Sequence, residues 1–531
     1  MILWMDQVTD RSQSDVDRAI LLLSKAWTSY SEDEKIEYLN GLKGCLNTSD
    51  LKRIKNNISL LNEVLELNLT ISEVPRIPTK EYFDEILTNV SEIRKAYMVH
   101  TTTPVTPAQP LNDFEKWNNI EQILYDVYEI LMNNFNYYAP TKVVFGKDTE
   151  KETGRLVKEQ GASSVLVHFG GKSAIASGLI DRVCQSLKEE GIAYETLGGV
   201  VPNPRLSKVR EGIALCREKK IDFILAVGGG SVIDSAKAIG YGVANEGDVW
   251  DFYAKKRVPT ACLPIGAVLT IAAAGSEMSN SSVITNEDGG LKRGCNTDLC
   301  RCRFAVMNPE LTYTLPDYQT QCGCTDIMMH TMERYFNMSE NMELTDGISE
   351  ALIKTVMKHS KILKEHPECY ESRAEVMWAS SLSHNDLTGC GTDGGDWACH
   401  QLEHEIGGMF DVAHGAGLAA VWGSWARYVY KARPERFAKF ARNIFNIQET
   451  DDEKAAVAGI EAMENYYRSV GMPTSLCELG IHATEEQIKE MADKCSFYGK
   501  RTVGVMKKIG APEAAEIYRM ANDKSIPLYS R

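Results

Sequence analysis

Four of the ten histidines in this chain of 531 residues lie in two short segments that also carry small and apolar residues. The first segment, TDIMMH, spans residues 325–330 and places Asp326 four positions before His330. The second, WACHQLEHEIGGMFDVAHGAG, spans residues 397–417, repeats this spacing with His400 and His404, and continues to His414. Residues four apart lie on one face of a helix, about one turn from each other. His414 follows a break that contains Gly-Gly, and this break could return it to the same face.

The residue types in these segments suit a divalent cation. An aspartate together with three histidines provides the mixed oxygen and nitrogen ligands that Fe2+ or Zn2+ accepts. The set holds one ligand more than the ion needs if a substrate oxygen must also bind, so one histidine is expected to have a different role. A single pair at this spacing is also common on solvated faces and in helix cores. Two such pairs, each among apolar and small residues, favour a metal site.

A second motif indicates phosphate binding. The buried strand predicted at 222–227 (DFILAV) ends in Gly228–Ser231, and a helix is predicted at 232–242. Glycines let backbone N–H groups approach a pyrophosphate closely, and the start of the helix adds partial positive charge. Asp234, one turn into the helix, could accept a hydrogen bond from a ribose or a nicotinamide amide. The alternative is a tight turn that serves only helix–sheet packing, and the motif is not the Rossmann GxGxxG.

Strand and helix signals alternate around this motif from residue 142 onward. A buried strand is predicted at Ser164–Phe169, followed by Gly170–Ser173 and a helix to about Glu190. A further strand is predicted at Ala193–Leu197, then a Pro-Asn-Pro turn and a helix through Cys216. This succession predicts a doubly wound parallel sheet that binds ligands at the carboxyl ends of its strands.

The chain after the sheet signals is predicted to be helical. Lys292 follows the turn 286–290 and precedes a strand predicted at 304–308. It could complement a cofactor phosphate, or it could be a solvated surface lysine. After Pro316 the apolar spacing is helical to the end of the chain. We therefore expect an α/β nucleotide-binding domain at 132–314 and an all-α domain with the metal residues at 315–531.

Residues 1–131 look like a separate, mainly helical extension, because leucines and isoleucines recur there at helical spacing. Three prolines in HTTTPVTPAQPLN, at 100–112, indicate an extended linker, and a last helix is predicted at 114–133. From Met132 onward the chain reads like the start of an independent protein that opens with an edge strand. A gene fusion is therefore one interpretation of this junction.

Composition excludes several classes of partner. The chain has 58 basic and 73 acidic residues and a formal net charge of −15, which disfavours a nucleic acid or an anionic membrane. No apolar run reaches the ~20 residues of a membrane helix, and the N-terminus does not read as a signal peptide. Fourteen scattered cysteines fit a reducing cytosol, so we expect a cytoplasmic protein.

Five of the cysteines could in principle hold zinc. They are Cys295, Cys300, Cys302, Cys322 and Cys324. Their C-x-C pairs lack the wider spacing of structural zinc sites, so free thiols are expected.

From Asn134 to about Tyr529 the chain resembles the iron-containing (group III) alcohol dehydrogenases, and among them the NADPH-using butanol dehydrogenases of clostridia. The resemblance rests on VVPNPR, AVGGGSVIDSAKAI, LTIAAAGSEMS, TDIMMHTMERYF, MWASSL and CHQLEHEIGGMFDVAHG, which occur in the family's order and spacing. Several long motifs in register are far more specific than any one of them. The N-terminal block, with GLKGCLNTSDLKRIKNNISLL and PLNDFEKWNNIEQILYDVYEIL, resembles small structural proteins of phage tails in gut bacteria.

The resemblance implies a role for each candidate residue. The family's metal ligands fall on Asp326, His330, His400 and His414, and His404 matches a non-ligand histidine that relays a proton beside the cofactor. The implied cofactor contacts are Asn203, Gly228, Gly229, Gly230, Ser231, Asp234, Thr270, Ser279, Val283 and Lys292. Members that prefer NAD carry an acidic residue after the first strand. Here that place is occupied by Gly170, Gly171, Lys172 and Ser173, which offer donors and no carboxylate to a 2′-phosphate, so NADP(H) is expected.

Two features depart from the family's pattern. Related enzymes commonly have a threonine where this chain has Ala274, and a lost hydroxyl near the cofactor would cost roughly 0.5–1.5 kcal/mol of binding. Cys322 and Cys324 crowd Asp326, which leaves oxidation or an altered choice of metal open.

The resemblance implies hydride transfer between NADP(H) and a primary alcohol or aldehyde, such as butanol and butanal, with Fe2+ or Zn2+ in a cleft between the two domains. We also expect a homo-oligomer, a dimer or larger. Two alternatives remain. One is a glycerol-dehydrogenase-like enzyme that acts on polyols with NAD and zinc. The other is a structural or assembly protein led by residues 1–131.

Overall fold

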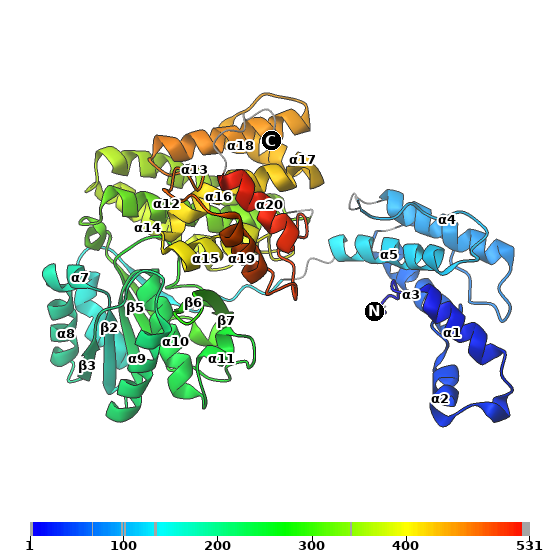
Figure 1. The fold of residues 1–531 in the computed structure, drawn as a ribbon, viewed down its shortest axis with the longest axis horizontal. Helices are drawn as coiled ribbons and strands as arrows, with labels where there is room; N and C mark the ends of the chain where they lie inside the picture. The colour runs from blue at the N-terminus through cyan, green and yellow to red at the C-terminus, as the bar shows by residue number, and fades with distance from the viewer. Residues whose placement is uncertain are drawn as a thin grey trace. The chain divides into compact units, whose positions relative to one another are not determined.

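The computed structural model describes residues 4–65, 67–96, 99, 102–131, 135–339 and 342–522. It divides the chain into two compact units, Met1–Asn134 and Phe135–Arg531 (Figure 1). Among the described residues, no helix combines the length and the apolar character that crossing a bilayer requires.

The first unit is helical, as the spacing of its apolar residues predicts. Its helices are α1 (Gln13–Leu23), α2 (Glu32–Asn40), α3 (Thr48–Val64), α4 (Lys80–Ala96) and α5 (Phe114–Leu131), with a 3-10 turn at Trp27–Ser29. Helices α3, α4 and α5 share an apolar core that includes Ile54, Val90 and Ile123. Next to this core the buried guanidinium of Arg11 lies 2.8 Å from a carboxylate oxygen of Glu121.

The predicted linker and junction of the first unit fall partly outside the described residues. Residues 102–112 form neither helix nor strand, as expected for a linker, whereas His100 and Thr101 are not described. Met132–Asn134, at the predicted junction, are not described either.

The second unit contains a six-stranded parallel sheet, which confirms the predicted fold class. Its strands are β1 (Lys142–Phe145), β2 (Ser164–Phe169), β3 (Ala193–Leu197), β4 (Phe223–Gly228), β5 (Ile265–Leu269) and β8 (Phe304–Met307). They lie in the order β1-β8-β5-β4-β2-β3, and every neighbouring pair is parallel. The first strand is an edge strand, as predicted from the junction.

Helices cover both faces of this sheet because successive strand residues point to opposite sides. Along β4, Ile224 and Ala226 face a core shared with α9 and α10, while Phe223 and Leu225 face a core shared with α6 and α8. The helices of this part are α6 (Thr153–Glu159), α7 (Lys172–Ala176), α8 (Leu179–Glu189), α9 (Leu206–Lys219), α10 (Gly230–Ala244) and α11 (Trp250–Tyr253). Short 3-10 turns lie at Thr149–Glu152, Asp298–Cys300 and Pro309–Thr312.

One expectation for this part was wrong, and one element was missed. The helix predicted after Gly170–Ser173 is broken, because Gly178 has a φ of 69° and separates α7 from α8. The chain around Lys292 forms an antiparallel hairpin, β6 (Ser281–Asn286) and β7 (Leu291–Asn296), which was not predicted. Its strands carry no regular alternation of apolar and polar residues, so no period-two pattern marked them.

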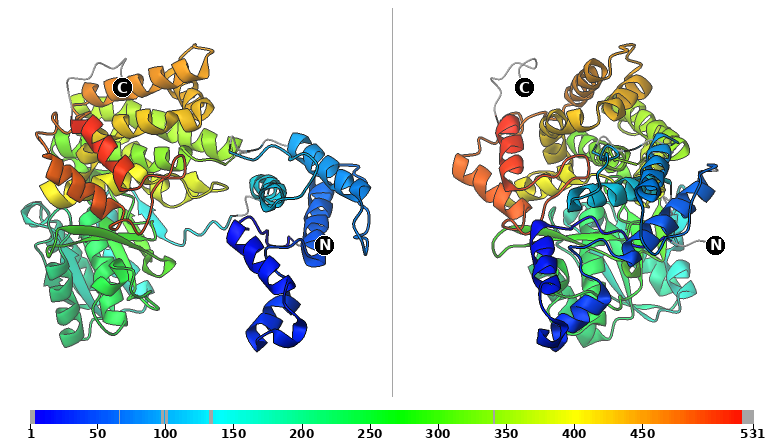
Figure 2. Two further views of the ribbon diagram at one scale, coloured as in Figure 1. Left: turned by 45° about the vertical axis from the view of Figure 1, so that its right-hand side comes forward. Right: turned by 90° about the vertical axis from the view of Figure 1, so that its right-hand side faces the viewer.

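The rest of the second unit is helical, as predicted. Its helices are α12 (Asp317–Tyr335), α13 (Glu343–Glu365), α14 (Tyr370–His384), α15 (Ala398–Phe410), α16 (His414–Val429), α17 (Pro434–Phe445), α18 (Asp452–Ser469), α19 (Glu485–Cys495) and α20 (Ala511–Asn522), with 3-10 turns at Leu387–Gly389 and Tyr430–Ala432. In Figures 1 and 2 this helical part lies above the sheet part. Helix α12 is buried continuously from Thr320 to Tyr335, so its polar residues face protein on every side.

The sheet part and the helical part meet backbone to backbone along a seam just beyond β5. A Cβ placed on Gly323 of α12 would come within 2.2 Å of the carbonyl oxygen of Ala272, just beyond β5. A Cβ on Gly275, which has a φ of 59°, would come within 2.5 Å of the carbonyl oxygen of Ser380 on α14. Only glycine permits these approaches. The seam therefore fixes α12 against the carboxyl end of β5.

Candidate metal and cofactor site

Three of the predicted metal ligands meet in the helical part, and they come from three different helices. Asp326 lies on α12, His400 on α15, and His414 is the first residue of α16. One ligand atom from each lies within 4.8 Å of the other two. Nε2 of His400 and Nε2 of His414 each lie 3.6 Å from Oδ1 of Asp326. Ligands at about 2.0–2.2 Å from one tetrahedral ion would be roughly 3.4 Å apart, so this spacing suits a single cation.

His330, the fourth predicted ligand, lies beside this trio. Its Nδ1 is 3.4 Å from Oδ1 of Asp326, and its ring centroid is 4.5 Å from that of His400. The group with mutual distances within 4.8 Å does not include it. Within the described part of the chain, Oδ1 of Asp326, Nδ1 of His330 and Nε2 of His400 are buried without a hydrogen-bond partner. Such atoms are costly unless something binds them, so the residues fit a divalent cation.

The turn between α15 and α16 differs from the predicted break. Gly407 and Gly408 remain helical, and α15 continues to Phe410. The chain turns instead at Asp411, which has a φ of 51°, and α16 begins at His414. Aspartate tolerates this left-handed conformation better than most residues. The turn, not the glycine pair, brings His414 back toward His400.

Two buried glutamates orient the imidazoles from behind. Oε2 of Glu333 contacts Nδ1 of His400, and its Oε1 accepts the backbone N–H of His400 at 3.1 Å. Oε2 of Glu403 contacts Nδ1 of His414. An acceptor at Nδ1 holds the ring proton there and leaves the Nε2 lone pair for a cation. The sequence interpretation missed both glutamates, because nothing in their spacing separates them from solvated carboxylates.

These carboxylates set the charges of the site. Burial alone would lower the pKa of His400, but the charges and hydrogen bonds of Glu333 and Asp326 together outweigh it and raise the pKa to about 9. Burial alone would raise the pKa of Glu403, but His414 and Lys292 outweigh it and lower the pKa to about 2. Glu403 therefore faces the imidazole of His414 as an anion at neutral pH.

His404, the predicted proton relay, lies one turn after His400 on the same helix. Its ring centroid is 6.5 Å from that of His400 and 6.0 Å from that of His414. Burial first, and the nearby charge of Lys292 second, hold its pKa well below the usual value. The ring is therefore neutral at neutral pH, so one nitrogen can donate a proton and the other can accept one.

An aromatic wall that the sequence interpretation missed flanks the histidines. The ring of Trp397 lies 5.5 Å from that of His400 and 5.7 Å from that of His384. The guanidinium of Arg334 lies 4.6 Å from the centroid of the indole, and His384 lies 4.1 Å from the ring of His330. Trp397 has a φ of 58°, which is rare for a bulky side chain and is concentrated at functional sites.

The predicted phosphate loop lies at the carboxyl end of β4. Gly228–Ser231 spans the end of this strand and the first residues of α10, with Gly229 between the two elements. A Cβ on Gly228 would come within 2.5 Å of Val232, and one on Gly229 or Gly230 within 3.0 Å of Ile271 or Ala274. Tight packing therefore requires these glycines whether or not a phosphate binds. Ala274, where relatives commonly have threonine, lies directly against this loop.

A second loop reaches the same sheet edge, because β2 is the neighbour of β4. Gly170–Ser173 follows β2 and opens α7. A Cβ on Gly170 would lie 3.7 Å from Val232, whereas Gly171 faces open space. Lys172 and Ser173 are exposed. Both predicted nucleotide-binding loops therefore lie at the carboxyl ends of adjacent parallel strands, where such folds bind ligands.

Asp234 connects α10 to the hairpin. Its Oδ1 accepts the hydroxyl of Ser276 at 2.5 Å, and its Oδ2 accepts the backbone N–H of Val283 at 2.9 Å. Burial raises the pKa of Asp234, and the charge of Lys237 opposes that rise. Asp234 and Val283, both predicted cofactor contacts, therefore hold each other in place. Their contact with a cofactor stays a prediction.

Lys237 holds the segment that carries two other predicted contacts. Its buried ammonium donates to the carbonyl oxygens of Ser276 at 2.7 Å, Ser279 at 2.9 Å and Ser281 at 2.8 Å. The backbone N–H of Thr270 donates to the carbonyl oxygen of Gly228 at 3.1 Å. Ser279 and Thr270 are thus fixed by the protein itself, close to the phosphate loop.

Asn203 and Lys292 link the sheet part to the histidine helices. Asn203 has a φ of 53°, and its Nδ2 donates to Oδ1 of Asp411 at 2.9 Å. Lys292 is 5 % exposed, and its Nζ lies 3.1 Å from Oε2 of Glu403 and 3.4 Å from Nδ1 of His414. The alternative of a solvated surface lysine is therefore wrong. Its contact with a cofactor phosphate stays a prediction.

The cysteines near Asp326 are buried thiols. Burial raises the pKa of Cys322 and of Cys324 to about 12. Thiols with such a pKa stay protonated at neutral pH and make poor nucleophiles. All fourteen cysteines of the chain are free.

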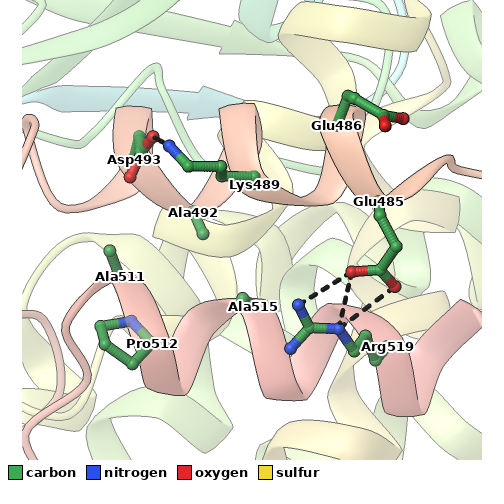
Figure 3. A pocket seen from close by; sticks show the side chains of 9 residues that line it. All are labelled: Glu485, Glu486, Lys489, Ala492, Asp493, Ala511, Pro512, Ala515 and Arg519. Atoms are coloured by element: carbon green, nitrogen blue, oxygen red, sulfur yellow. Dashed lines mark hydrogen bonds and ion pairs between the residues drawn. The ribbon is translucent and has the colours of Figure 1, made fainter.

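A groove of about 440 Å³ lies on the surface between α19 and α20 (Figure 3). Ala492, Ala511, Pro512 and Ala515 line it together with charged residues. Two ion pairs bridge its charged residues, Arg519 with Glu485 at 2.8 Å and Lys489 with Asp493 at 2.5 Å. None of the lining residues belongs to the predicted metal or cofactor set.

Comparison with known proteins identifies the family that shares this fold and site. Residues 140–309 match the family model "Iron-containing alcohol dehydrogenase", and residues 320–521 match "Fe-containing alcohol dehydrogenase family, C-terminal". The chain belongs to the iron-containing alcohol dehydrogenase family. Both matches fall within the second unit. The resemblance of residues 1–131 to phage-tail proteins stays a prediction.

Named relatives of this alcohol dehydrogenase match over almost their whole length. The chain is 39% identical to NADH-dependent butanol dehydrogenase A of Clostridium acetobutylicum, over 73% of this chain and 99% of the relative. It is 33% identical to an NADPH-dependent aldehyde reductase of Escherichia coli, over 73% and 100%. The crystal structure of NADH-dependent butanol dehydrogenase A from Thermotoga maritima superposes with a TM-score of 0.71 at 38% identity, covering 74% of this chain and 99% of that one.

These relatives confirm the predicted family and the activity class. The chain is an oxidoreductase of the alcohol dehydrogenase type, and its family implies a nicotinamide cofactor and iron. Some of the named relatives use NADH and another uses NADPH, so sequence similarity does not decide between the two cofactors.

Proposed function

We propose that residues 135–531 catalyse hydride transfer between NADP(H) and a primary alcohol or aldehyde, such as butanol and butanal. The observation that carries this proposal is the convergence of buried, unpartnered ligand atoms from Asp326, His330 and His400, joined by His414. Carboxylates behind two of these imidazoles add to it, because an oriented Nε2 lone pair is what a cation requires.

Asp326, His330, His400 and His414 would hold Fe2+ or Zn2+. A divalent cation there would polarise a carbonyl oxygen and offset the negative charge that develops on it. Glu333 and Glu403 fix the tautomers of His400 and His414 through their Nδ1 contacts. The chain thus supplies ligands that are preorganised before substrate enters.

His404 would move the proton. Its ring lies on the same helix as His400 and is held neutral by burial, with its centroid 6.0 Å from that of His414. A neutral imidazole can pass a proton from one ring nitrogen to a developing alkoxide while its other nitrogen takes up a proton from solvent, so the ring stays neutral throughout. Trp397 and His384 flank the same histidines and would exclude water from one side of the reacting carbonyl.

The cofactor would lie along the carboxyl edge of the sheet and supply the hydride. Gly228–Ser231 would bind the pyrophosphate at the start of α10, where backbone N–H groups are free of helical partners. Exposed Lys172 and Ser173, with Gly171 open to solvent, would bind the 2′-phosphate of NADP(H). A lysine ammonium there favours the extra phosphate. The proposed preference for NADP(H) agrees with the NADPH-dependent aldehyde reductase and differs from the NADH-dependent butanol dehydrogenase.

One experiment tests the whole proposal. The full chain is purified without oxygen, its metal content is measured, and aldehyde reduction is assayed with NADPH and with NADH. We expect about one Fe2+ or Zn2+ per chain and a higher kcat/KM with NADPH. The same protein stripped of metal should lose activity and regain it when the ion is restored. Full activity without metal would refute the metal assignment, and faster turnover with NADH would refute the cofactor assignment.

We also propose that the enzyme is cytoplasmic. Free cysteines throughout the chain suit a reducing compartment such as the cytoplasm. A homo-oligomer stays a prediction, and light scattering of the full chain and of residues 135–531 measures it. Equal activity of both proteins would oppose the alternative in which residues 1–131 determine function.

A further inference from the structure

The hairpin β6–β7 joins the cofactor edge to the histidine helices. At one end Asp234 of α10 accepts the backbone N–H of Val283, and at the other end Lys494 donates to the carbonyl oxygen of Gly289 at 3.0 Å. A Cβ on Gly290 would come within 3.1 Å of the carbonyl oxygen of Gly408 on α15. The hairpin is thus fixed to α10, α15 and α19.

Two successive basic residues on β7 are both buried, which is unusual because neighbours on a strand point to opposite faces. Each pairs with a glutamate on α15. Nζ of Lys292 lies 3.1 Å from Glu403, and Nη1 of Arg293 lies 2.7 Å from Glu405. The side chains of Glu403 and Glu405 are 0% and 1% exposed. A buried charge needs a partner of opposite charge. Each of these two basic side chains therefore balances the charge of one buried carboxylate.

The two ion pairs differ in the other contacts that the glutamate makes. Oε2 of Glu403 also contacts Nδ1 of His414, while its Oε1 has no hydrogen-bond partner within the described part of the chain. The side chain of Glu403 is packed between two glycines: a Cβ on Gly407 would lie 2.8 Å from its Oε1, and one on Gly417 would lie 2.9 Å from its Cγ. Lys292 is therefore the cation that holds the carboxylate facing His414.

We infer that Lys292 is a positioning residue for the metal site: by holding Glu403 it fixes the orientation of His414 and so sets the affinity for the cation. This inference rests on the proposed metal site. It assigns the ammonium a role within the protein that does not depend on a cofactor phosphate. Removing a group that orients a ligand imidazole typically weakens metal binding about 10- to 100-fold.

The test measures Zn2+ binding to the metal-free full chain by competition with a chromophoric chelator. Lys292→Met should raise the dissociation constant about 10- to 100-fold, and Lys292→Arg should restore it to within about threefold. Arg293→Met is the matched control, because it removes the other buried pair from the same strand. It should leave Zn2+ affinity within about threefold of the original chain. An equal loss in Arg293→Met would overturn the inference.

Further measurements keep the test decisive. NADPH binding to the metal-free Lys292→Met protein is measured alongside; a large loss there with unchanged Zn2+ affinity would make Lys292 a phosphate contact only and overturn the inference. If Lys292→Met fails to fold, Glu403→Gln removes the same contact from the other side and should weaken Zn2+ equally. Where both variants fold, Lys292→Met should add no further loss to Glu403→Gln, and additive losses would refute the coupling. An original chain without Zn2+ binding would refute the proposed function itself.

Discussion

Glu333→Gln tests the orientation of the ligand imidazoles most directly. Each oxygen of Glu333 serves one group of His400, the ring Nδ1 and the backbone N–H. A glutamine of the same shape offers one oxygen and one N–H2 group, so it can accept from only one of the two. Either the ring loses its acceptor, or the first turn of α15 loses one of its caps.

The expected loss of Zn2+ affinity follows from the free energy of the lost hydrogen bond, which is made to a charged group. A hydrogen bond to a charged group contributes about 1.5–3 kcal/mol, and 1.4 kcal/mol corresponds to a factor of ten. If most of that energy stabilises the bound form of His400, Zn2+ affinity should fall roughly 10- to 100-fold. We expect chelator competition on the metal-free chain to measure that loss, with an unchanged circular dichroism spectrum at 25 °C.

Glu464→Gln is the matched control. Glu464 is also a buried carboxylate of the helical part, but it pairs with Arg427 at 2.6 Å and contacts none of the histidines. Its substitution should lower the melting temperature and leave Zn2+ affinity within about threefold of the original chain. Unchanged affinity in Glu333→Gln, or an equal loss in Glu464→Gln, would refute the reasoning.

The remaining predictions concern the histidines and the cofactor edge. His414→Ala should lose metal and nearly all NADPH-dependent aldehyde reduction, which metal analysis and a butanal assay measure; retained metal would contradict its assignment. His404→Ala should keep the metal but lower kcat and flatten the pH profile, and loss of metal would show that it is a ligand. The pKa of His400 is raised to about 9 in the metal-free chain, so below that pH a cation must displace a proton. Affinity should therefore rise with pH, by about tenfold per unit between pH 6 and 8, and a flat profile would contradict this. Lys172→Glu should raise KM for NADPH at least about tenfold and leave KM for NADH within about threefold; equal changes would remove Lys172 from the phosphate site.

The sequence predicted the parts of the site that local spacing determines. Asp326 and His330 share a helix turn, as do His400 and His404, and the buried strands around Gly228 are marked by continuous apolar runs. The fold class followed from the alternation of such runs with helical spacing, because that alternation reports which faces are buried.

Features that depend on distant partners could not be predicted in this way. Glu333 is separated from His400 by 67 residues, so its role appears only once α12 packs against α15. The hairpin carrying Lys292 has no period-two pattern, since its basic residues are buried by α15 and α19 and not by the sheet. The turn at Asp411 was misplaced to Gly407 and Gly408, because glycine marks breaks on average; here Gly407 leaves room for Glu403, and Gly408 leaves room for the main chain of Gly290.

The seam between Gly323 and Ala272 has a mechanical consequence. Where two main chains touch without side chains between them, no rotamer change can absorb a shift, and a displacement of even one bond length meets hard repulsion. The approach of Gly290 to the carbonyl oxygen of Gly408 adds a second contact of this kind, so the sheet part and the helical part cannot be pressed closer together at either place.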